Sequence, residues 1–282
     1  KLNHVSQDEV TGDCYGLNHL SFFSNVKLKG QDIMPRLLED DEVYQKTDMR
    51  FFEKDLAKHL GCILNEYLYY FYYREMALEN ILKAGITRGE VIRDVNRGMT
   101  EELSHMDIEH DFDNCLRVFE KWYGMRENAY MANETGIKTG KPPFSFDIYE
   151  KDSGGYAGVA LKYMYSELSG QESEMILCVP NQGAIPGLRD TDVVEITCTI
   201  RDGKYIPHKI DEPGELQMEL IRRVKSYERY ASQALRTNSR SKAVEFLLPC
   251  TEAGFTIYRI KQKLYRGVDI DGFRWRSRLY QY

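Results

Sequence analysis

One short segment of the sequence pairs two residue types that bind ligands or metals. In Gly16-Leu17-Asn18-His19-Leu20, a histidine near the end of a predicted strand follows an amide side chain. An imidazole is a common metal ligand, and an amide binds hydroxyl groups. A histidine with its hydrogen bonds satisfied inside a core has the same sequence appearance, so this pair alone leaves binding and packing open.

A second segment, Tyr67–Tyr73, holds five tyrosines. At helical spacing Tyr67 and Tyr70 share one face with Phe71, whereas Tyr69 and Tyr73 share another. Some of the hydroxyls must therefore reach water, a partner or a ligand. A tyrosine works as a general base only when a nearby cation or metal lowers its pKa from about 10. The alternative is a packing helix or an oligomer interface.

Two further segments carry charge. Arg88, in Thr87-Arg88-Gly89-Glu90-Val91, stands at a predicted helix start, where the helix dipole favours anions. Its guanidinium and the free N–H groups there suit a phosphate, and a surface arginine is the alternative. The stretch 104–113 is rich in histidine and acidic residues. Its spacing fits no known metal-ligand motif, so the pattern favours a solvated acidic turn.

Length and composition narrow the class of protein. A chain of 282 residues suits one large domain or two ordinary ones, and its net charge of −6 argues against a nucleic-acid binder. Residues 251–282 hold seven basic and three acidic residues and so carry +4, which leaves −10 for residues 1–250. Six scattered cysteines without a Cys-x-x-Cys pair indicate reduced thiols and a cytoplasmic protein.

The hydrophobic patterns predict the elements that must position these residues. We expect a strand at Tyr15–Ser24 and a long helical region at Phe51–Leu82. Further helices are expected near 32–39, 88–106, 111–123, 156–168 and 214–235, and strands near 174–179 and 193–201. Helices that outnumber separated strands indicate an α+β fold. The sequence contains neither Gly-x-Gly-x-x-Gly nor a Walker-type phosphate loop.

Five segments, taken in order, resemble the glycoside hydrolase family 4 of NAD- and manganese-dependent 6-phospho-glycosidases. The resemblance covers roughly residues 10–245. It rests on Gly16-Leu17-Asn18-His19-Leu20, Tyr67-Leu68-x-Tyr70-Phe71, Thr87-Arg88-Gly89-Glu90-Val91 (one residue shorter than in the family), Gly154-Gly155-Tyr156, and Val179-Pro180-Asn181-x-Gly183-x-Ile185 followed by Val194-Glu195. Among its members, the 6-phospho-β-glucosidase type is the most similar, on the strength of Tyr69-Tyr70-Phe71 and Glu75-Met76. An α-specific member remains an alternative.

The resemblance implies a reaction that does not use the usual pair of carboxylates. NAD removes a hydride from C3 of the sugar, which acidifies the proton on C2. A tyrosine takes that proton while Mn²⁺ holds the C2 and C3 oxygens, and the aglycone leaves by elimination. Carried over by position, Tyr67 is the catalytic base and His19 a metal ligand. Asn18 and Arg88 bind the substrate, with Arg88 on the 6-phosphate.

The resemblance also implies how the chain is organised. We expect residues 1–250 to form the substrate- and metal-binding C-terminal domain, with a fold like the lactate/malate dehydrogenase C-terminal domain: long helices packed on a small antiparallel sheet. Residues 251–282 form a basic, aromatic tail that the family pattern does not match. We expect the family's N-terminal Rossmann domain, with its NAD site and metal cysteine, to be absent from this chain. Cys14 is too close to His19 to be that metal cysteine, so we predict that it is structural.

Three further expectations concern activity, assembly and substrate. We expect the isolated chain to be inactive, a homodimer or homotetramer to form, and a phosphorylated glucoside or disaccharide to be the substrate. A non-catalytic binding or oligomerisation module with the same fold is the alternative. The two readings differ in geometry, because an enzyme needs Asn18, His19, Tyr67 and Arg88 on one surface, with His19 and Tyr67 within about 10 Å of each other.

Overall fold

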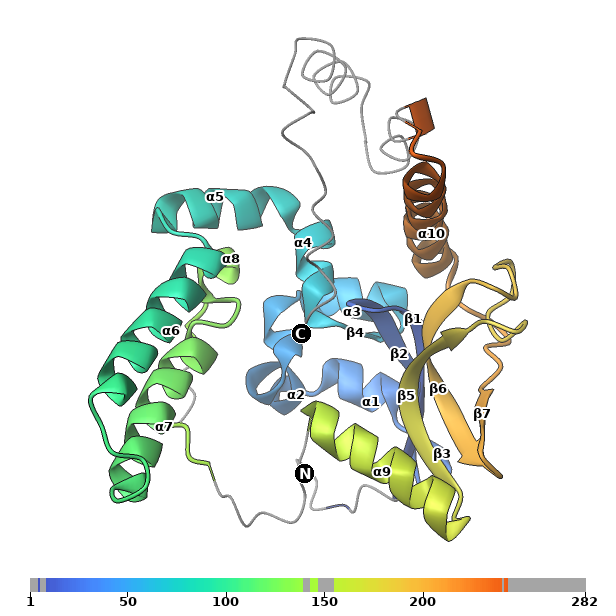
Figure 1. Cartoon of the computed structure of the whole chain (residues 1–282). Coiled ribbons are helices and arrows are strands. Elements are labelled where there is room, and N and C mark those ends of the chain that lie inside the picture. The colour runs from blue at the N-terminus through green and yellow to red at the C-terminus, as the bar shows by residue number, and fades with distance from the viewer. Residues whose placement is uncertain (1–4, 6–8, 139–142, 147–154, 240, 243–282) are drawn as a thin grey trace. The chain divides into compact units, whose positions relative to one another are not determined.

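The strands in the part of the chain that the structure describes form one antiparallel sheet. A computed structural model describes residues 5, 9–138, 143–146, 155–239 and 241–242 (Figure 1). Among these residues the sheet has the order β3-β2-β1-β6-β5, with β4 paired to β2 and β7 paired to β6. The strands are β1 (Val10–Leu17), β2 (Leu20–Leu28), β3 (Gln31–Asp32), β4 (Ile63–Leu64), β5 (Ser173–Pro180), β6 (Val193–Arg201) and β7 (Lys204–Pro207).

Helices make up most of the remaining described chain, which confirms the α+β prediction. They are α1 (Met34–Glu39), α2 (Asp41–Lys46), α3 (Lys54–Leu60), α4 (Tyr69–Tyr72), α5 (Arg74–Ala84), α6 (Arg88–Ser104), α7 (Phe112–Asn128), α8 (Ala132–Thr135), α9 (Gly155–Ser169) and α10 (Glu215–Thr237), with 3₁₀ turns η2 (Asp48–Phe51) and η3 (Glu66–Leu68). The predicted tail at 251–282 lies outside the described residues.

The core of the sheet is built by period-two alternation along its central strands. In β6 the side chains of Val194, Ile196, Cys198 and Ile200 are all at most 1% exposed. Alternate residues of a strand point to the same face, so these four form one apolar row. In the neighbouring hairpin, Phe22 of β2 is completely buried. This buried row makes the sheet a rigid element, and the site described below is attached to it.

The single strand predicted at Tyr15–Ser24 is wrong: the structure has a hairpin with its turn inside that segment. In the hairpin Leu17 pairs with Leu20, which leaves Asn18 and His19 as a two-residue turn. Both segments are apolar and alternate, so the pattern looks continuous through the turn. The signal for the break is Gly16, which has a φ of 143°.

The long helix predicted at Phe51–Leu82 is also interrupted. Helix α3 ends at Gly61, whose φ of 65° is the left-handed conformation that commonly closes helices. The chain then forms β4, which pairs with β2 through Phe22 and Leu64. It returns to helix at Asn65, whose side chain accepts a hydrogen bond from the Tyr67 N–H at 3.0 Å and so caps the turn η3.

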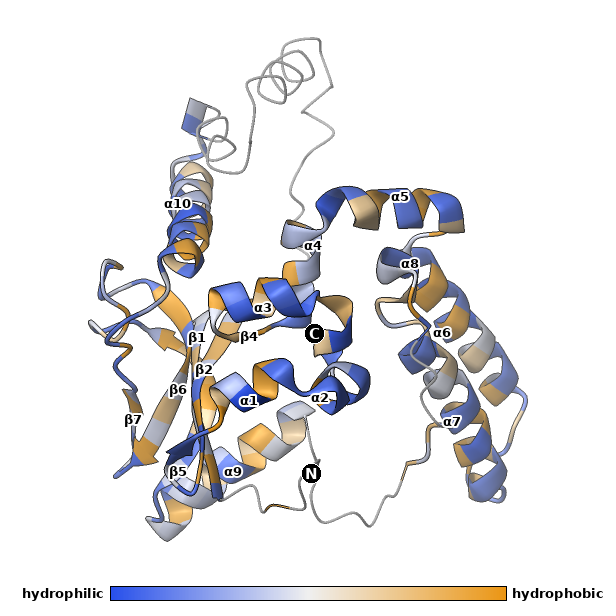
Figure 2. Ribbon diagram, turned by 180° about the vertical axis from the view of Figure 1, so that it is seen from behind, coloured by the Kyte–Doolittle hydropathy of each residue, from blue (hydrophilic) through white to orange (hydrophobic). Residues whose placement is uncertain are grey.

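Helices α6 and α7 lie side by side as an antiparallel pair (Figure 1). The indole ring of Trp122 packs directly on Gly98, where an added Cβ would lie 2.3 Å from the ring. The Trp122 N–H donates to the Glu102 carboxylate at 2.7 Å. Hydrophobic and hydrophilic segments alternate along both helices (Figure 2). The pair therefore presents a fixed framework for the residues at its ends, which include Arg88.

The described chain divides into two compact units. The first contains the sheet and helices α1–α9, and the second contains residues 181–192 and the chain from Asp211 onward. In the second unit the buried Asn181 side chain bonds both to the N–H and to the carbonyl of Ile185. Burial raises the pKa of Asp192, but its hydrogen bonds with Arg229 and with the Arg189 N–H outweigh burial and hold that pKa below its usual range. Asn181 of the Val-Pro-Asn motif is thus a structural residue.

Candidate active site

The hairpin tip presents His19 in a constrained backbone conformation. His19 has a φ of 64°, and its side chain is exposed. A non-glycine residue with positive φ is uncommon, and such strain is often found at functional sites. Gly16 makes the turn possible, because a Cβ at that position would lie 2.2 Å from the carbonyl oxygen of Leu20. Asn18 is exposed beside His19 as the first residue of the turn.

The interruption of the predicted long helix brings Tyr67 to this tip. Strand β4 pairs with β2, and the Asn65 N–H then donates to the carbonyl of Ser21 at 3.1 Å. Tyr67 comes two residues later, and its ring stacks on the imidazole of His19 with ring centroids 4.4 Å apart and an interplanar angle of 21°. The separation is well inside the limit of about 10 Å that the enzymatic reading requires.

Tyr130 lies on another side of Tyr67. The two rings meet edge to face, with centroids 6.2 Å apart and an angle of 88°. The Tyr130 hydroxyl donates to Glu66 at 2.8 Å. Burial, hydrogen bonds with Tyr67 and Glu66, and the charge of Glu66 together raise the pKa of Tyr130 far above its usual value. Tyr130 therefore stays a neutral phenol that can position the Tyr67 ring.

Arg88 reaches the same group of residues from the start of α6. Thr87 caps this helix in a capping box, in which the Glu90 N–H donates to the Thr87 hydroxyl and the Thr87 N–H donates to Glu90. The Arg88 guanidinium lies over the Tyr130 ring at 5.6 Å and donates to the Arg126 carbonyl at 3.0 Å. These contacts hold the Arg88 guanidinium next to Tyr130, whose ring in turn contacts the ring of Tyr67.

Tyr67, Arg88 and Tyr130 line one cavity of about 390 Å³. Its lining residues are Glu66, Tyr67, Tyr70, Arg88, Ile92, Arg126, Glu127, Tyr130, Met131 and Glu134. The structure thus brings together Tyr67 and Arg88 in one cavity, with His19 stacked on Tyr67. The sequence did not predict four of the lining residues, Glu66, Arg126, Tyr130 and Glu134. The helix predicted near 111–123 ended short of Tyr130 and Glu134.

The predicted division of the tyrosines of segment 67–73 between two faces is confirmed. Tyr69 and Tyr73 stack on each other at 5.1 Å on one face, whereas Tyr67 and Tyr70 line the cavity. Burial, then the charge of Glu134 and a hydrogen bond with it, raises the pKa of Tyr70 above its usual value, and the charge of Arg88 opposes this. The phenol of Tyr70 therefore lies within electrostatic reach of Glu134 and Arg88.

The described residues supply at most part of a metal site. Among them no group of three or more histidine, cysteine, aspartate or glutamate side chains could hold a metal ion. The exposed imidazole of His19 is available as one ligand of a divalent transition metal, and further ligands would have to come from elsewhere. Burial and the charge of Glu195 raise the pKa of the Cys14 thiol to about 12, so this cysteine stays protonated, in keeping with a structural role.

The acidic segment after α6 is a solvated turn, as predicted. His105, Asp107 and His110 are exposed, and the Asp107 carboxylate accepts from the backbone N–H of Glu109 at 3.1 Å. His110 contacts the same carboxylate at 2.8 Å. These bonds close the turn between α6 and α7.

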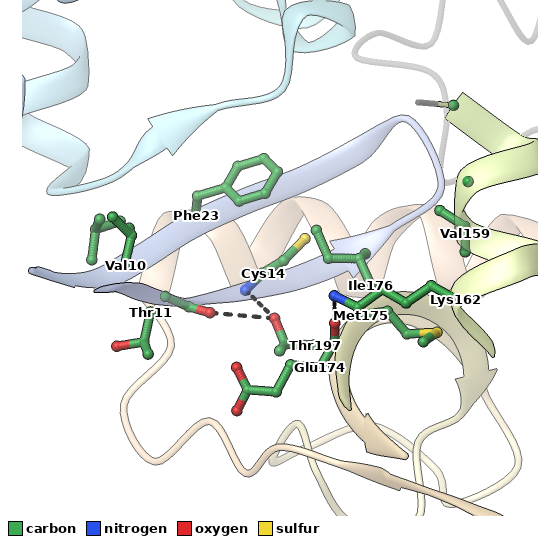
Figure 3. Close-up of a pocket in the computed structure, with 14 residues that line it drawn as sticks. Val10, Thr11, Cys14, Phe23, Val159, Lys162, Glu174, Met175, Ile176 and Thr197 are labelled. Carbon is green, nitrogen blue, oxygen red and sulfur yellow. Dashed lines mark hydrogen bonds between the residues drawn. The ribbon is translucent and has the colours of Figure 1, made fainter. Parts of the chain in front are cut away.

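A larger cavity, of about 730 Å³, lies between the sheet and α9 (Figure 3). Its wall is mostly apolar, with Val10, Phe23, Val159 and Ile176 among the lining residues. Two pairs of its polar groups are hydrogen-bonded to each other: the Cys14 N–H donates to the Thr197 hydroxyl at 2.9 Å, and Lys162 donates to the Glu174 carbonyl at 2.9 Å. None of the residues predicted to act in catalysis lines this cavity.

No helix in the part of the chain that the structure describes is long and apolar enough to cross a membrane.

Comparison with known protein families gives a match over most of the chain. Residues 14–249 match the protein family described as "Family 4 glycosyl hydrolase C-terminal domain". Among curated proteins, 6-phospho-beta-glucosidase BglT of Thermotoga maritima is 25% identical over 236 residues, covering 83% of this chain and 48% of that protein. Maltose-6'-phosphate glucosidase MalH of Clostridium acetobutylicum is 24% identical over 257 residues, covering 86% and 51%. The chain thus spans about half the length of these relatives.

Solved structures show the same fold. A Thermotoga maritima 6-phospho-beta glucosidase, solved with manganese, NAD+ and glucose-6-phosphate, has a TM-score of 0.58 and 20% identity, over 94% of this chain and 55% of that one. A 6-phospho-alpha-glucosidase from gut microorganisms, solved with NAD and Mn2+, has a TM-score of 0.54 and 18% identity, over 94% and 57%. These likenesses support the expected dehydrogenase-like C-terminal fold.

Proposed function

Because the chain belongs to family 4 of the glycosyl hydrolases, whose C-terminal domain it matches over residues 14–249, we propose that it forms the substrate-binding and base-bearing part of a 6-phospho-glycosidase. The observation that carries the proposal is the convergence of three side chains. Tyr67 and Arg88 line one cavity, and the His19 ring lies 4.4 Å from that of Tyr67. A binding module with the same fold would have no need for this arrangement.

Tyr67 is the base that takes the C2 proton of the sugar. Its ring is held by the His19 stack on one side and by the edge contact with Tyr130 on another. Fixing the ring fixes the direction of its hydroxyl, and a positioned base is worth far more than a mobile one. The backbone bond from its N–H to the capping side chain of Asn65 fixes the turn that carries it.

His19 offers its imidazole to the metal, and Asn18 lies beside it for a sugar hydroxyl. When bound, Mn²⁺ would polarise the C2 and C3 oxygens, and NAD would take the hydride from C3. The Thermotoga structure solved with manganese and NAD+ supports both groups for this chain. Because the described residues supply one candidate metal ligand and the sequence has no dinucleotide motif, we propose that the chain alone does not hydrolyse glycosides.

Arg88 binds the 6-phosphate of the substrate. The cavity is of mixed sign, since Arg88 and Arg126 share it with Glu66, Glu127 and Glu134. Its average field therefore does not attract a dianion, and a phosphate binds only through direct contact with a guanidinium. The Glu66 carboxylate is occupied by the Tyr130 hydroxyl, which reduces its effect on the anion.

The proposed substrate is a 6-phospho-β-glucoside, and the proposed site of action is the cytoplasm. Similarity to BglT supports the β-anomer. Similarity to MalH, at nearly the same identity, makes an α-glucoside such as a phosphorylated maltose the second candidate. A homodimer or homotetramer stays a prediction.

Replacing Arg88 with methionine tests the phosphate site. We expect Arg88→Met to weaken binding of glucose 6-phosphate by the purified chain about 10- to 100-fold, the value of a hydrogen-bonded charge contact, while glucose binding stays weak and unchanged. Isothermal titration calorimetry measures both. Arg93→Met is the matched control, because Arg93 is on the same helix but pairs with Asp94 at 2.9 Å outside the cavity. Equal affinities of wild-type and Arg88→Met for glucose 6-phosphate would contradict the proposal.

A further inference from the structure

Glu134 has an unpartnered oxygen at the wall of the Tyr67 cavity. Glu134 as a residue is 2% exposed, and its Oε2 atom has no hydrogen-bond partner in the structure. A buried polar atom without a partner costs free energy, and the cost is larger for a charged group. Glu134 lines the cavity, so a ligand in that space is able to supply the missing donor.

The backbone holds Glu134 where it is. The short helix α8 is bounded by two residues with positive φ, Met131 at 56° and Gly136 at 71°. The Asn80 side chain donates to the Glu134 carbonyl at 3.0 Å, and the Asn133 side chain donates to the Ile86 carbonyl at 3.1 Å. These bonds tie α8 to the end of α5 and to the loop before α6. The backbone of Glu134 is therefore fixed beside the cavity that its side chain lines.

Tyr70 connects Glu134 to the residues of the proposed reaction. The phenol of Tyr70 is hydrogen-bonded to the Glu134 carboxyl, which leaves Oε2 as the oxygen without a partner, and it interacts with Arg88 and Tyr67. All four residues line the same cavity. A ligand whose phosphate contacts Arg88 and whose carbon faces Tyr67 therefore lies within reach of Glu134.

We propose that Glu134 accepts a hydrogen bond from a hydroxyl of the bound phosphosugar and selects substrates that carry this hydroxyl. The inference rests on the proposed function. A carboxylate accepts hydrogen bonds and donates none, so the matching ligand group is a donor such as a sugar hydroxyl. A site built around such a bond rejects analogues that lack the hydroxyl, because its own buried group is then left unpaired.

The hydroxyl in question is the one on C4. The ring positions between C2, which faces Tyr67, and C6, whose phosphate contacts Arg88, are C3, C4 and C5. The C3 oxygen takes part in the oxidation, and C5 carries no free hydroxyl in a pyranose ring. C4 is left, and its hydroxyl distinguishes glucosides from 4-deoxy sugars.

Binding of 4-deoxyglucose 6-phosphate tests this inference. Titration of the purified chain with glucose 6-phosphate and with the 4-deoxy analogue gives a ratio of dissociation constants for each variant. We expect the wild type to prefer glucose 6-phosphate about 10- to 100-fold, Glu134→Gln to prefer it less, and Glu134→Met to bind both alike. Glu127→Met is the matched control, since Glu127 lines the same cavity and is absent from the buried unpartnered groups of the described chain.

Loss of the preference in Glu134→Met and its retention in Glu127→Met support the inference. A wild type that binds both sugars alike, or a Glu134→Met variant that keeps the full preference, overturns it while leaving the phosphate site intact. A wild type that binds glucose 6-phosphate no better than glucose overturns the proposed function, and the role of Glu134 with it.

Discussion

Replacing Tyr67 with phenylalanine is expected to lower the turnover of the holoenzyme, meaning the complete 6-phospho-glycosidase loaded with NAD and Mn²⁺, about 10²- to 10⁴-fold, the range in which a positioned general base contributes. The substitution removes one oxygen atom. It keeps the ring that stacks on His19 at 4.4 Å and meets Tyr130 edge to face. The loss should therefore appear in kcat, with little change in the affinity for glucose 6-phosphate. Steady-state kinetics with p-nitrophenyl-β-glucoside 6-phosphate measures both.

A second tyrosine of the same segment serves as the control for that variant. The Tyr73 hydroxyl accepts a hydrogen bond from the Glu53 N–H at 3.0 Å, and its ring stacks on Tyr69, outside the cavity. Tyr73→Phe loses a hydroxyl in the same way and should keep wild-type turnover. Wild-type turnover in Tyr67→Phe would remove Tyr67 from the mechanism.

Replacing Gly16 with alanine is expected to destabilise the chain by about 2–4 kcal/mol, because a steric clash adds to backbone strain. Gly16 has a φ of 143°, and an added Cβ would lie 2.2 Å from the Leu20 carbonyl oxygen and 2.8 Å from the Ser21 Cα. Both atoms are backbone, so no side chain can move aside. The hairpin must open, which also displaces His19. Urea denaturation monitored by circular dichroism measures the change in the free energy of unfolding.

Gly30 provides the control at the other end of β2. It also has positive φ, 81°, but an added Cβ meets nothing within 4 Å. Gly30→Ala should therefore cost about 1–2 kcal/mol, the strain of a left-handed residue alone. Equal losses in the two variants would show that the close approach of Gly16 to Leu20 does not constrain the turn.

Local patterns in the sequence are enough to predict strands with alternating apolar residues and helices with a capping motif or an amphipathic repeat. The strand predicted at 193–201 is β6, found at Val193–Arg201, because its alternating apolar row is buried on one face. Helix α6 begins at Arg88, as predicted, since Thr87 and Glu90 form a capping box. The amphipathic pattern at 214–235 likewise corresponds to α10.

The elements that position the site are the ones that local patterns miss. Hydrophobic periodicity continues through Gly16 and through Gly61, so it predicts one strand and one helix where the chain turns. In both places a glycine with positive φ marks the break, and after Gly61 the tertiary pairing of β4 with β2 makes the chain a strand. The turns, which the periodicity hides, are what bring His19 and Tyr67 together.

Other site residues depend on contacts between distant parts of the chain. Tyr130 meets Glu66 across 64 positions, and Asn80 meets Glu134 across 54. No local pattern encodes such a pairing. Met131, which precedes helix α8 and Glu134, has the left-handed conformation although it is neither glycine nor asparagine, so the sequence gives no signal for it. The family resemblance reached Tyr67 and Arg88 because their motifs are local, and it did not reach Glu134.

The fate of the C2 proton tests the proposed role of Tyr67 most directly. When the holoenzyme hydrolyses a 6-phospho-β-glucoside in D₂O, proton abstraction by Tyr67 and the later addition of solvent place deuterium on C2 of the released glucose 6-phosphate. Proton NMR of the product detects the exchange at that carbon. We expect full deuteration at C2. Hydrolysis that leaves the original proton on C2 would contradict it, because the bond would then break without the step for which Tyr67 is positioned.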